Sequence, residues 1–300
     1  MSVEREVFVC VKQAMSIAGP ASVGPQAAPR AGTAPRPVRN EADMFALEEA
    51  LRARDRGEVE RVVCVSVGSP RAREALVAAL AMGADHAVRI DVSDDAGLDA
   101  GATAALLASA IGALGGRLVF AAQTSDDGRS GLVPAFLARR LDAVYLSNAA
   151  TFRLTDGEVE IQRRVKRGGR QVWRAALPAV VAFDGGINVP RYPRVAARFR
   201  ARRQAIEETS PAVLGVDLGS LPRPVAILRI EPLRRRTKKM ALPAREGSAA
   251  DRMRALVGGG IAAKASKVVA GPVDQLVAAT VAFLKERRLL EHGRAKSGRK

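Results

Sequence analysis

Short apolar runs alternate with longer amphipathic segments through the first 141 residues of the chain. The apolar runs, which are typical of buried strands, cover residues 6–12, 62–67, 87–90 and 118–122. Apolar residues recur at helical spacing in residues 40–55, 70–82, 103–114 and 132–141. Strands that alternate with helices in this way predict an α/β fold with a doubly wound, mostly parallel sheet.

After residue 141 the pattern changes to one that is typical of antiparallel strands. Three strand-like segments, residues 143–154, 158–166 and 170–176, are separated by the turn pairs Asp156-Gly157 and Gly168-Gly169. An apolar strand follows at 179–183, and then a polar loop leads into a basic helix. We therefore expect an antiparallel β excursion attached to the parallel sheet.

The rest of the chain predicts two further regions beyond an α/β domain that covers residues 1–206. Residues 207–240 read as an extended arm with a strand at 225–230. Residues 241–300 form a C-terminal extension with a helix at 273–290 and a basic, mobile end.

The stretch 117–141 joins a buried strand to a helix through a loop that contains Gly128, Ser130 and Gly131. Such a layout allows backbone N–H groups and the positive end of a helix to meet a phosphate. Many ordinary strand-to-helix connections at a sheet edge have the same layout, so both interpretations stay open. Asp126 and Asp127 would repel a phosphate, and we expect them to bind ribose hydroxyls, cap backbone N–H groups or face solvent.

Two features near the start of the chain bear on this loop. Asn40 precedes a helix and Asp43 follows three residues later, which predicts an N-cap with a capping-box-like start. The first strand is not followed by a G-x-G-x-x-G turn, so a standard dinucleotide fold is disfavoured. Residues 16–38 are instead rich in Pro, Gly and Ala, and a loop of that length is either functional or mobile.

Composition narrows the function classes. The formal charge of +17 permits an acidic partner, but aromatic residues make up 4 % of the chain and do not interleave with the basic runs. No zinc-finger spacing or helix-turn-helix signature is present, so we expect no nucleic-acid binding. Residues 100–116 are too short and too weakly apolar to span a bilayer, so we expect no membrane insertion.

The cysteines and histidines do not suggest catalysis or metal binding. Cys10 and Cys64 lie in apolar, strand-like runs, which is typical of reduced core cysteines in a cytoplasmic protein. His86 and His292 are the only histidines, and we expect His86 to be a structural residue with a satisfied ring. The first residues enter a strand without a charged-then-apolar leader, so we expect no secretion signal.

Several segments together resemble the β subunit of electron transfer flavoproteins. The matching blocks keep the family order over roughly residues 5–235 and are VCVK at 9–12, NEAD-x-x-ALEEA at 40–50, ALAMGADHAV within 78–88, the loop at 123–134, LPAVVAF at 177–183 and NVPRYP at 188–193. The resemblance implies a Rossmann-like fold of the adenine nucleotide α-hydrolase type. It also implies a heterodimer in which an α subunit holds most of the contacts to a redox FAD.

In this resemblance the β subunit binds a structural AMP. The residues that would contact AMP are Cys10, Asn40, Glu41, Ala42, Asp43, Val67, Ala122, Gln123, Thr124, Ser125, Asp126, Asp127, Gly128, Arg129, Ser130 and Gly131. Cys10, Val67 and Ala122 lie at the carboxyl ends of three of the expected strands, where open parallel sheets bind their ligands. The chain departs from the family at residues 19–37, where relatives have a short β excursion.

The resemblance also implies a loop at residues 191–200 that docks flavin-dependent dehydrogenases through an apolar anchor, here Val195. The docking residues would be Arg191, Tyr192, Val195, Phe199 and Arg200. The alternative interpretation takes Tyr192, Val195 and Phe199 as core contacts of a short helix. Arginines that follow in the same helix would steer an acidic partner.

The resemblance implies an electron carrier and not an enzyme with its own catalytic residues. Together with its α subunit, the chain would pass electrons from a dehydrogenase to a downstream oxidoreductase, because the flavin supplies the redox chemistry. Two alternatives stay open. One is a bifurcating protein with a second FAD in the AMP position, and the other is a nucleotide-binding protein of the same fold without electron transfer.

Overall fold

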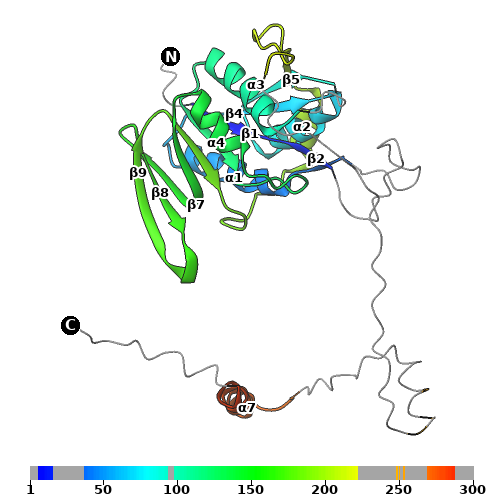
Figure 1. Ribbon diagram of the computed structural model, residues 1–300, viewed down its shortest axis with the longest axis vertical. Helices are drawn as coiled ribbons and strands as arrows, with labels where there is room; N and C mark the ends of the chain where they lie inside the picture. The colour runs from blue at the N-terminus through cyan, green and yellow to red at the C-terminus, as the bar shows by residue number, and fades with distance from the viewer. Residues whose placement is uncertain are drawn as a thin grey trace. The chain divides into compact units, whose positions relative to one another are not determined.

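The computed structural model describes residues 6–15, 37–93 and 98–221, together with residues 248, 250, 253 and 269–287. The chain divides into two compact units, residues 1–233 and 234–300, and each is described by itself. The predictions of a long loop at 16–38, a strand at 225–230 and a mobile end fall largely or wholly outside the described residues. Figure 1 shows the elements of both units.

Nine described strands form one sheet in the first unit. In the order in which they pair, they are β11 (Glu207–Thr209), β5 (His86–Asp91), β4 (Arg61–Gly68), β1 (Glu6–Cys10), β6 (Leu118–Ala122), β10 (Ala179–Phe183), β7 (Val144–Thr155), β8 (Glu158–Arg164) and β9 (Arg170–Ala176). All pairs from β11 to β7 are parallel, and the last two pairs are antiparallel. The predicted doubly wound, mostly parallel sheet is confirmed.

Helices cover both faces of the sheet. They are α1 (Glu41–Asp55), α2 (Arg73–Met82), α3 (Ala100–Ala113), α4 (Val133–Arg140) and α5 (Val195–Arg203). Buried residues of α1, α2 and α5 pack with one set of strand side chains, and those of α3 and α4 pack with the other. Alternation along β1 explains the division, because Val7 and Val9 face the first core and Phe8 faces the second.

The antiparallel excursion continues the same sheet. The first half of β7 pairs parallel with β10, and the second half pairs antiparallel with β8. The turn at Asp156-Gly157 is confirmed, since both residues have positive φ angles of 50° and 79°. The second turn lies one residue earlier than predicted: Arg167 and Gly168 adopt positive φ, and Gly169 does not.

The segment predicted as an arm begins as part of the α/β domain. β11 pairs with β5 at the sheet edge, with Glu207 opposite Val88 and Thr209 opposite Ile90. Leu214, Val216 and Leu218 then pack against the core between the sheet and α3. Contact of residues 207–240 with an α subunit stays a prediction.

The second unit contains the helix α7 (Val273–Glu286), which confirms most of the helix predicted at 273–290. Asp274 lies in its first turn and Lys285 in its last, an arrangement that suits the helix dipole. Among the described residues, no helix is long and apolar enough to cross a bilayer.

Candidate functional site

The carboxyl ends of the central parallel strands surround a cavity of about 700 Å³. Cys10 ends β1, Gly68 ends β4 and Ala122 ends β6, and all three line it. This is the edge of an open parallel sheet at which ligands bind, because loops diverge there on either side of the strands. The volume lies within the range of small-molecule sites.

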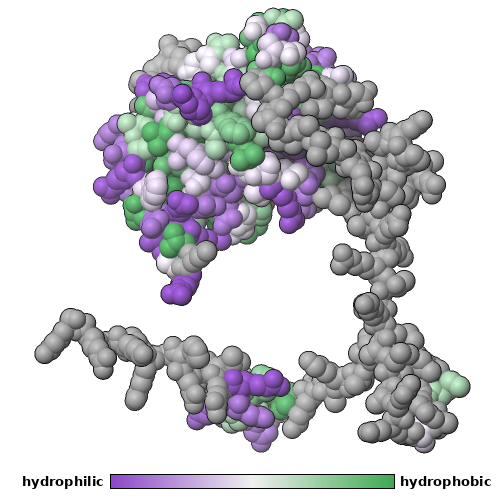
Figure 2. Space-filling model, viewed as in Figure 1, coloured by the Kyte–Doolittle hydropathy of each residue, from purple (hydrophilic) through white to green (hydrophobic). Residues whose placement is uncertain are grey.

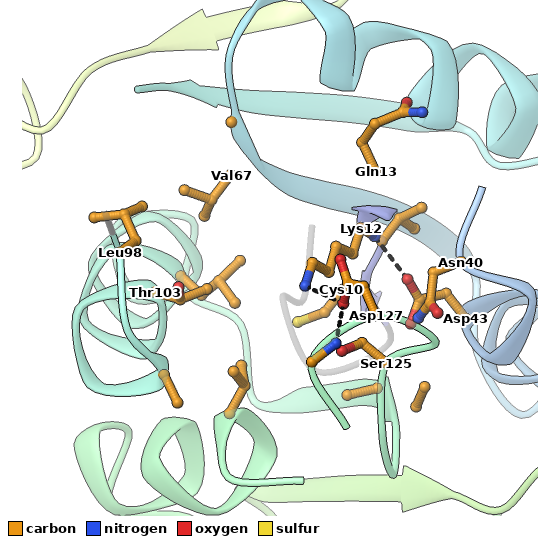
Figure 3. A pocket seen from close by; sticks show the side chains of 18 of the residues that line it. Cys10, Lys12, Gln13, Asn40, Asp43, Val67, Leu98, Thr103, Ser125 and Asp127 are labelled. Carbon is orange, nitrogen blue, oxygen red and sulfur yellow. Dashed lines mark hydrogen bonds and ion pairs between the residues drawn. The ribbon is translucent and has the colours of Figure 1, made fainter. Parts of the chain in front are cut away.

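The two sides of the cavity differ in chemistry. Figure 3 shows the polar side chains of Lys12, Asn40 and Asp127 gathered on one side, with Leu98 and Thr103 on the opposite side. The apolar side comes from the start of α3 and from the ends of β4 and β5. The remaining apolar lining residues there are Val65, Val67, Val92 and Leu107.

The loop between β6 and α4 is clamped to the start of α1. Asp126 donates its backbone N–H to Asn40 Oδ1 at 2.9 Å, and the Asp126 carboxylate accepts the backbone N–H of Glu41 at 2.8 Å. The predicted capping box is therefore wrong, because Asn40 makes no side-chain cap within its own helix. A residue 85 positions away in sequence caps the helix instead.

Asp127 is neutralised by groups of the first strand region. Its carboxylate accepts from Lys12 Nζ at 2.7 Å and from the backbone N–H of Met15 at 3.3 Å. It also accepts the backbone N–H of Gly128. Burial alone would raise the pKa of Asp127, but these hydrogen bonds, with one from Ser125, hold the pKa below its ordinary value. Asp127 therefore presents no uncompensated charge to a ligand.

Gln123 ties the same loop to strand β7. Its side-chain Nε2 donates to Tyr145 Oη at 3.0 Å, and its side-chain Oε1 accepts the backbone N–H of Asn148 at 2.9 Å. Asn148 has a φ of 54°, so the strand is irregular at this point. The loop is thus held from both sides, by α1 and by β7.

Asp43 is a buried carboxyl group on the polar side of the cavity. Its carboxylate accepts the backbone N–H of Lys12 at 2.6 Å. Burial raises the pKa of Asp43 from 3.8 to about 7, although hydrogen bonds from Lys12 and Asn40 lower it. Burial, and then the charge of Asp43, raise the pKa of the Cys10 thiol to about 12. Cys10 therefore stays protonated at neutral pH and is no nucleophile.

The loop can accept an anion near Gly131. Within residues 98–221, the backbone N–H groups of Ser130 and Gly131 donate to no protein acceptor, and both residues line the cavity. Gly131 has a φ of 66°, and a Cβ there would lie 3.3 Å from the carbonyl oxygen of Gln123. The loop backbone therefore leaves a narrow cradle, next to the first residues of α4, that suits a phosphate.

The cavity brings most of the expected nucleotide residues together. Those that line it are Cys10, Asn40, Asp43, Val67, Ala122, Gln123, Thr124, Ser125, Asp127, Gly128, Ser130 and Gly131. Glu41, Ala42, Asp126 and Arg129 are not part of its lining. Asp126 does not line the cavity, but its bonds to Glu41 and Asn40 hold the loop against the start of α1. AMP contact by any of these residues stays a prediction.

Sequence reasoning did not identify the wall formed by α3 or the role of Lys12. Lys12 lies two residues after the end of β1, and this position near a strand end is the signal that could have identified it. Leu98, Asp99 and Thr103 are brought in by the way α3 crosses the sheet, and no local pattern marks them. Among the described residues, no cluster of His, Cys, Asp and Glu could hold a metal ion.

The predicted partner of the His86 ring is confirmed, and of the two predicted core cysteines Cys64 is buried while Cys10 is half-buried at the cavity. His86 Nε2 lies 2.9 Å from a carboxylate oxygen of Glu207, so the ring has a partner on the neighbouring edge strand. Cys10 and Cys64 are both free thiols. Burial raises the pKa of Cys64 as well.

A second candidate site is the docking segment, residues 191–200. Tyr192, Val195 and Phe199 are 87 %, 70 % and 60 % exposed, so their interpretation as core contacts is wrong. Arg198 stacks over the Tyr192 ring, with its Cζ atom 5.4 Å from the ring centroid. Figure 2 shows that hydrophilic and hydrophobic residues are interspersed over the face in view.

Arg191 behaves differently from the other expected docking residues. Its guanidinium binds Glu48 and Asp55 of α1, and its backbone N–H donates to Glu48. The docking segment therefore consists of an anchored first residue and an exposed apolar and basic remainder.

Comparison with known proteins gives a family match over most of this domain. Residues 36–214 match the electron transfer flavoprotein domain. The electron transfer flavoprotein subunit beta of Mycobacterium leprae is 34 % identical over 186 residues, which cover 60 % of this chain and 70 % of the relative. The protein of the same name from Homo sapiens is 30 % identical over 222 residues, 72 % of this chain and 86 % of the relative. Protein FixA of Sinorhizobium fredii is 31 % identical over 188 residues, 60 % of this chain and 65 % of the relative.

Proposed function

The chain belongs to the electron transfer flavoprotein β-subunit family, and from this premise we propose that it binds AMP in the cavity as a structural ligand. In this proposal it pairs with an α subunit that holds most of the contacts to FAD. The complex accepts electrons from a flavin-dependent dehydrogenase and delivers them to a downstream oxidoreductase.

The observation that carries the nucleotide proposal is the free backbone cradle at Ser130 and Gly131. Among the described residues, the backbone N–H groups of Ser130 and Gly131 have no protein acceptor, and both residues line the cavity in which Lys12 pairs with Asp127. A phosphate there would receive these donors together with the positive end of α4. The adenine ring would lie against the apolar side formed by Val67 and Leu98.

The residues of the cavity support a binding role and not a chemical one. Cys10 stays protonated, and the Asp43 carboxylate is buried and holds the Lys12 backbone through a hydrogen bond, which is a structural role. FAD, when bound, would supply the electron transfer. The part of this chain is then to hold the nucleotide, to present the docking segment and to support the α subunit.

The docking segment supports a transient contact with a dehydrogenase. Val195 offers an exposed apolar anchor, and Tyr192 and Phe199 add aromatic area of the type that carries binding energy at interfaces. Arg198 and Arg200 lie on the same short helix, and a basic rim accelerates association with an acidic partner.

Nucleotide content tests the first part of the proposal. The chain is co-expressed with its α subunit, and nucleotides released from the denatured complex are separated and counted. One FAD and one AMP per complex support the structural-AMP carrier. Two FAD and no AMP would instead support the bifurcating type, and one FAD with no other adenine nucleotide would refute a nucleotide site in the cavity.

Electron transfer is tested with the same complex. A flavin-dependent dehydrogenase and its substrate are mixed with the complex, and loss of flavin absorbance is followed. Reduction that depends on the dehydrogenase supports the carrier function. A complex that holds nucleotide but is never reduced would point to a nucleotide-binding protein of the same fold.

A further inference from the structure

Glu48 is a buried carboxylate on the side of α1 that meets the docking segment. It is 3 % exposed, so it is shielded from solvent and from any partner protein. A buried charge is stable only when several donors compensate it. Arg52 of the same helix supplies one donor at 2.9 Å, and the other donors come from Arg191.

Arg191 surrounds this carboxylate with three donors. Its backbone N–H and its Nε both donate to Glu48 Oε2 at 2.9 Å, and one of its terminal nitrogens donates to Glu48 Oε1 at 3.2 Å. The same terminal nitrogen donates to Asp55 at 2.8 Å. Burial alone would raise the pKa of Glu48, but the bonds from Arg191 and Arg52 hold the pKa below its ordinary value.

A second tie lies just before the docking segment. The Asn188 side chain donates to the backbone carbonyl of Phe45 at 3.0 Å and to Glu49 at 3.5 Å. Residues 188 and 191 are therefore both fastened to α1, whereas Tyr192 and Val195 project outward. The position of the exposed residues of the docking segment therefore depends on where the backbone of Arg191 is held.

We propose that Glu48 is a positioning residue for partner docking: it holds the backbone and side chain of Arg191 so that the docking segment presents Val195 to a dehydrogenase. This inference rests on the proposed docking function. Glu48 acts through Arg191 and contacts no partner itself. The bond from the Arg191 backbone N–H to Glu48 fixes where the segment begins. The two bonds from the Arg191 side chain to Glu48 fix the direction of the guanidinium.

The charge of Glu48 is required for this role. Glu48→Gln keeps the volume of the side chain but gives one acceptor oxygen in place of two and removes the charge-assisted bonds. Such bonds are about twice as strong as neutral ones. The Arg191 side chain then keeps at most a neutral bond to residue 48 and its ion pair with Asp55, which is more than half exposed and is therefore screened by solvent.

The test compares αβ complexes that contain wild-type chain, Glu48→Gln, Arg191→Gln and Arg191→Lys. Hydrogen exchange at residues 191–200 is measured by mass spectrometry, and steady-state reduction by a flavin-dependent dehydrogenase gives kcat and KM for the complex. We expect exchange to rise about tenfold in Glu48→Gln, as for the loss of a charged hydrogen bond. We expect KM to rise about fivefold with kcat unchanged, since the chemistry is untouched.

Conservative and matched variants separate positioning from general stability. Arg191→Lys keeps the charge but not the bidentate geometry, so it should fall between wild type and Arg191→Gln in both readouts. Glu58→Gln is the matched control, because Glu58 pairs with Arg56 and Arg153 and with no residue of the docking segment. It should leave exchange at 191–200 and KM unchanged.

The outcomes decide between the inference and the function on which it rests. Val195→Asp should raise KM if the segment docks a dehydrogenase at all. If Val195→Asp raises KM and Glu48→Gln changes neither exchange nor KM, the positioning role is overturned and docking stands. If Val195→Asp has no effect on KM, the docking function fails and the inference fails with it. Should Glu48→Gln not fold, Arg191→Lys and Arg191→Gln give the same decision.

Discussion

Helix α1 is held by contacts of different kinds at its start and farther along its length. At its start, the loop between β6 and α4 is tied by side-chain oxygens that accept backbone N–H groups: Asp126 accepts from Glu41, and Asn40 accepts from Asp126. Farther along, the docking segment is tied by side-chain charge, through Glu48 and Arg191. The cavity should therefore be sensitive to changes in backbone shape, and the docking segment to changes in charge and exposed apolar area.

The strongest test of this contrast is Gly131→Val. A β-branched residue at a φ of 66° is strained, and its Cβ would crowd the Gln123 carbonyl at 3.3 Å. We expect a loss of about 3 kcal/mol from the free energy of unfolding. AMP recovered from the complex should fall below about a tenth of the wild-type amount, in line with ~1.4 kcal/mol per tenfold of affinity. An unchanged AMP content would contradict the cradle, and Gly157→Val, at a turn far along β7, serves as the control for strain alone.

A second test uses the titration of Asp43. Because its pKa is raised to about 7 in the folded chain, its contribution to stability is complete below its unfolded pKa and is lost as pH rises towards 7. The difference in unfolding free energy between wild type and Asp43→Asn should shrink by roughly 2–3 kcal/mol from pH 5 to pH 8. Urea unfolding at several pH values measures it, and a constant difference would contradict the raised pKa.

A smaller effect is expected from Asp126→Ala, which removes the cap supplied from outside the helix. Loss of a capping carboxylate costs about 1–2 kcal/mol of stability. The Asn40 side chain still accepts the backbone N–H of residue 126, so the cavity should keep its shape and the AMP content should fall only in part. Thermal unfolding of the complex measures the first effect. If Asp126→Asn, which keeps an acceptor oxygen, were as damaging as the alanine variant, loss of the cap would not be the cause.

The smallest change is expected from Val195→Ala. Removal of two exposed methyl groups from a docking anchor costs about 1 kcal/mol of binding, which corresponds to a KM about fivefold higher. AMP content and stability should not change, because the side chain is exposed. A fall in AMP content in this variant would show that the two regions are less separate than their contacts indicate.

Local patterns in the sequence predicted the elements of the sheet well, because each is defined by its own periodicity. The carboxyl edge of the sheet and the glycine loop also followed from strand ends and small residues. The capping box failed for a physical reason: Asn40 and Asp43 have the right spacing, yet Asp126 and Lys12 bind the same groups from distant parts of the chain. A prediction from sequence spacing does not include hydrogen-bond partners from distant parts of the chain.

The role of Arg191 could not be predicted for the same reason. Its partner Glu48 lies 143 positions away, and either residue alone looks like an exposed charge on a helix or loop. The apolar wall of the cavity was missed because it depends on how α3 crosses the sheet. Long-range packing, and not local propensity, decides these features.

The short ladder between β2 (Gln13–Met15) and β3 (Pro37–Arg39) joins two segments that are far apart in the sequence. Gln13 pairs with Arg39 and Met15 with Pro37, so the two ends of residues 16–36 are joined side by side before the chain reaches Asn40. Loop-closure entropy grows slowly with length, at about 0.6 kcal/mol for each doubling. A change in the number of residues between Met15 and Pro37 should therefore cost the ladder little closure entropy, which makes this connection a first place to test insertions in the subunit.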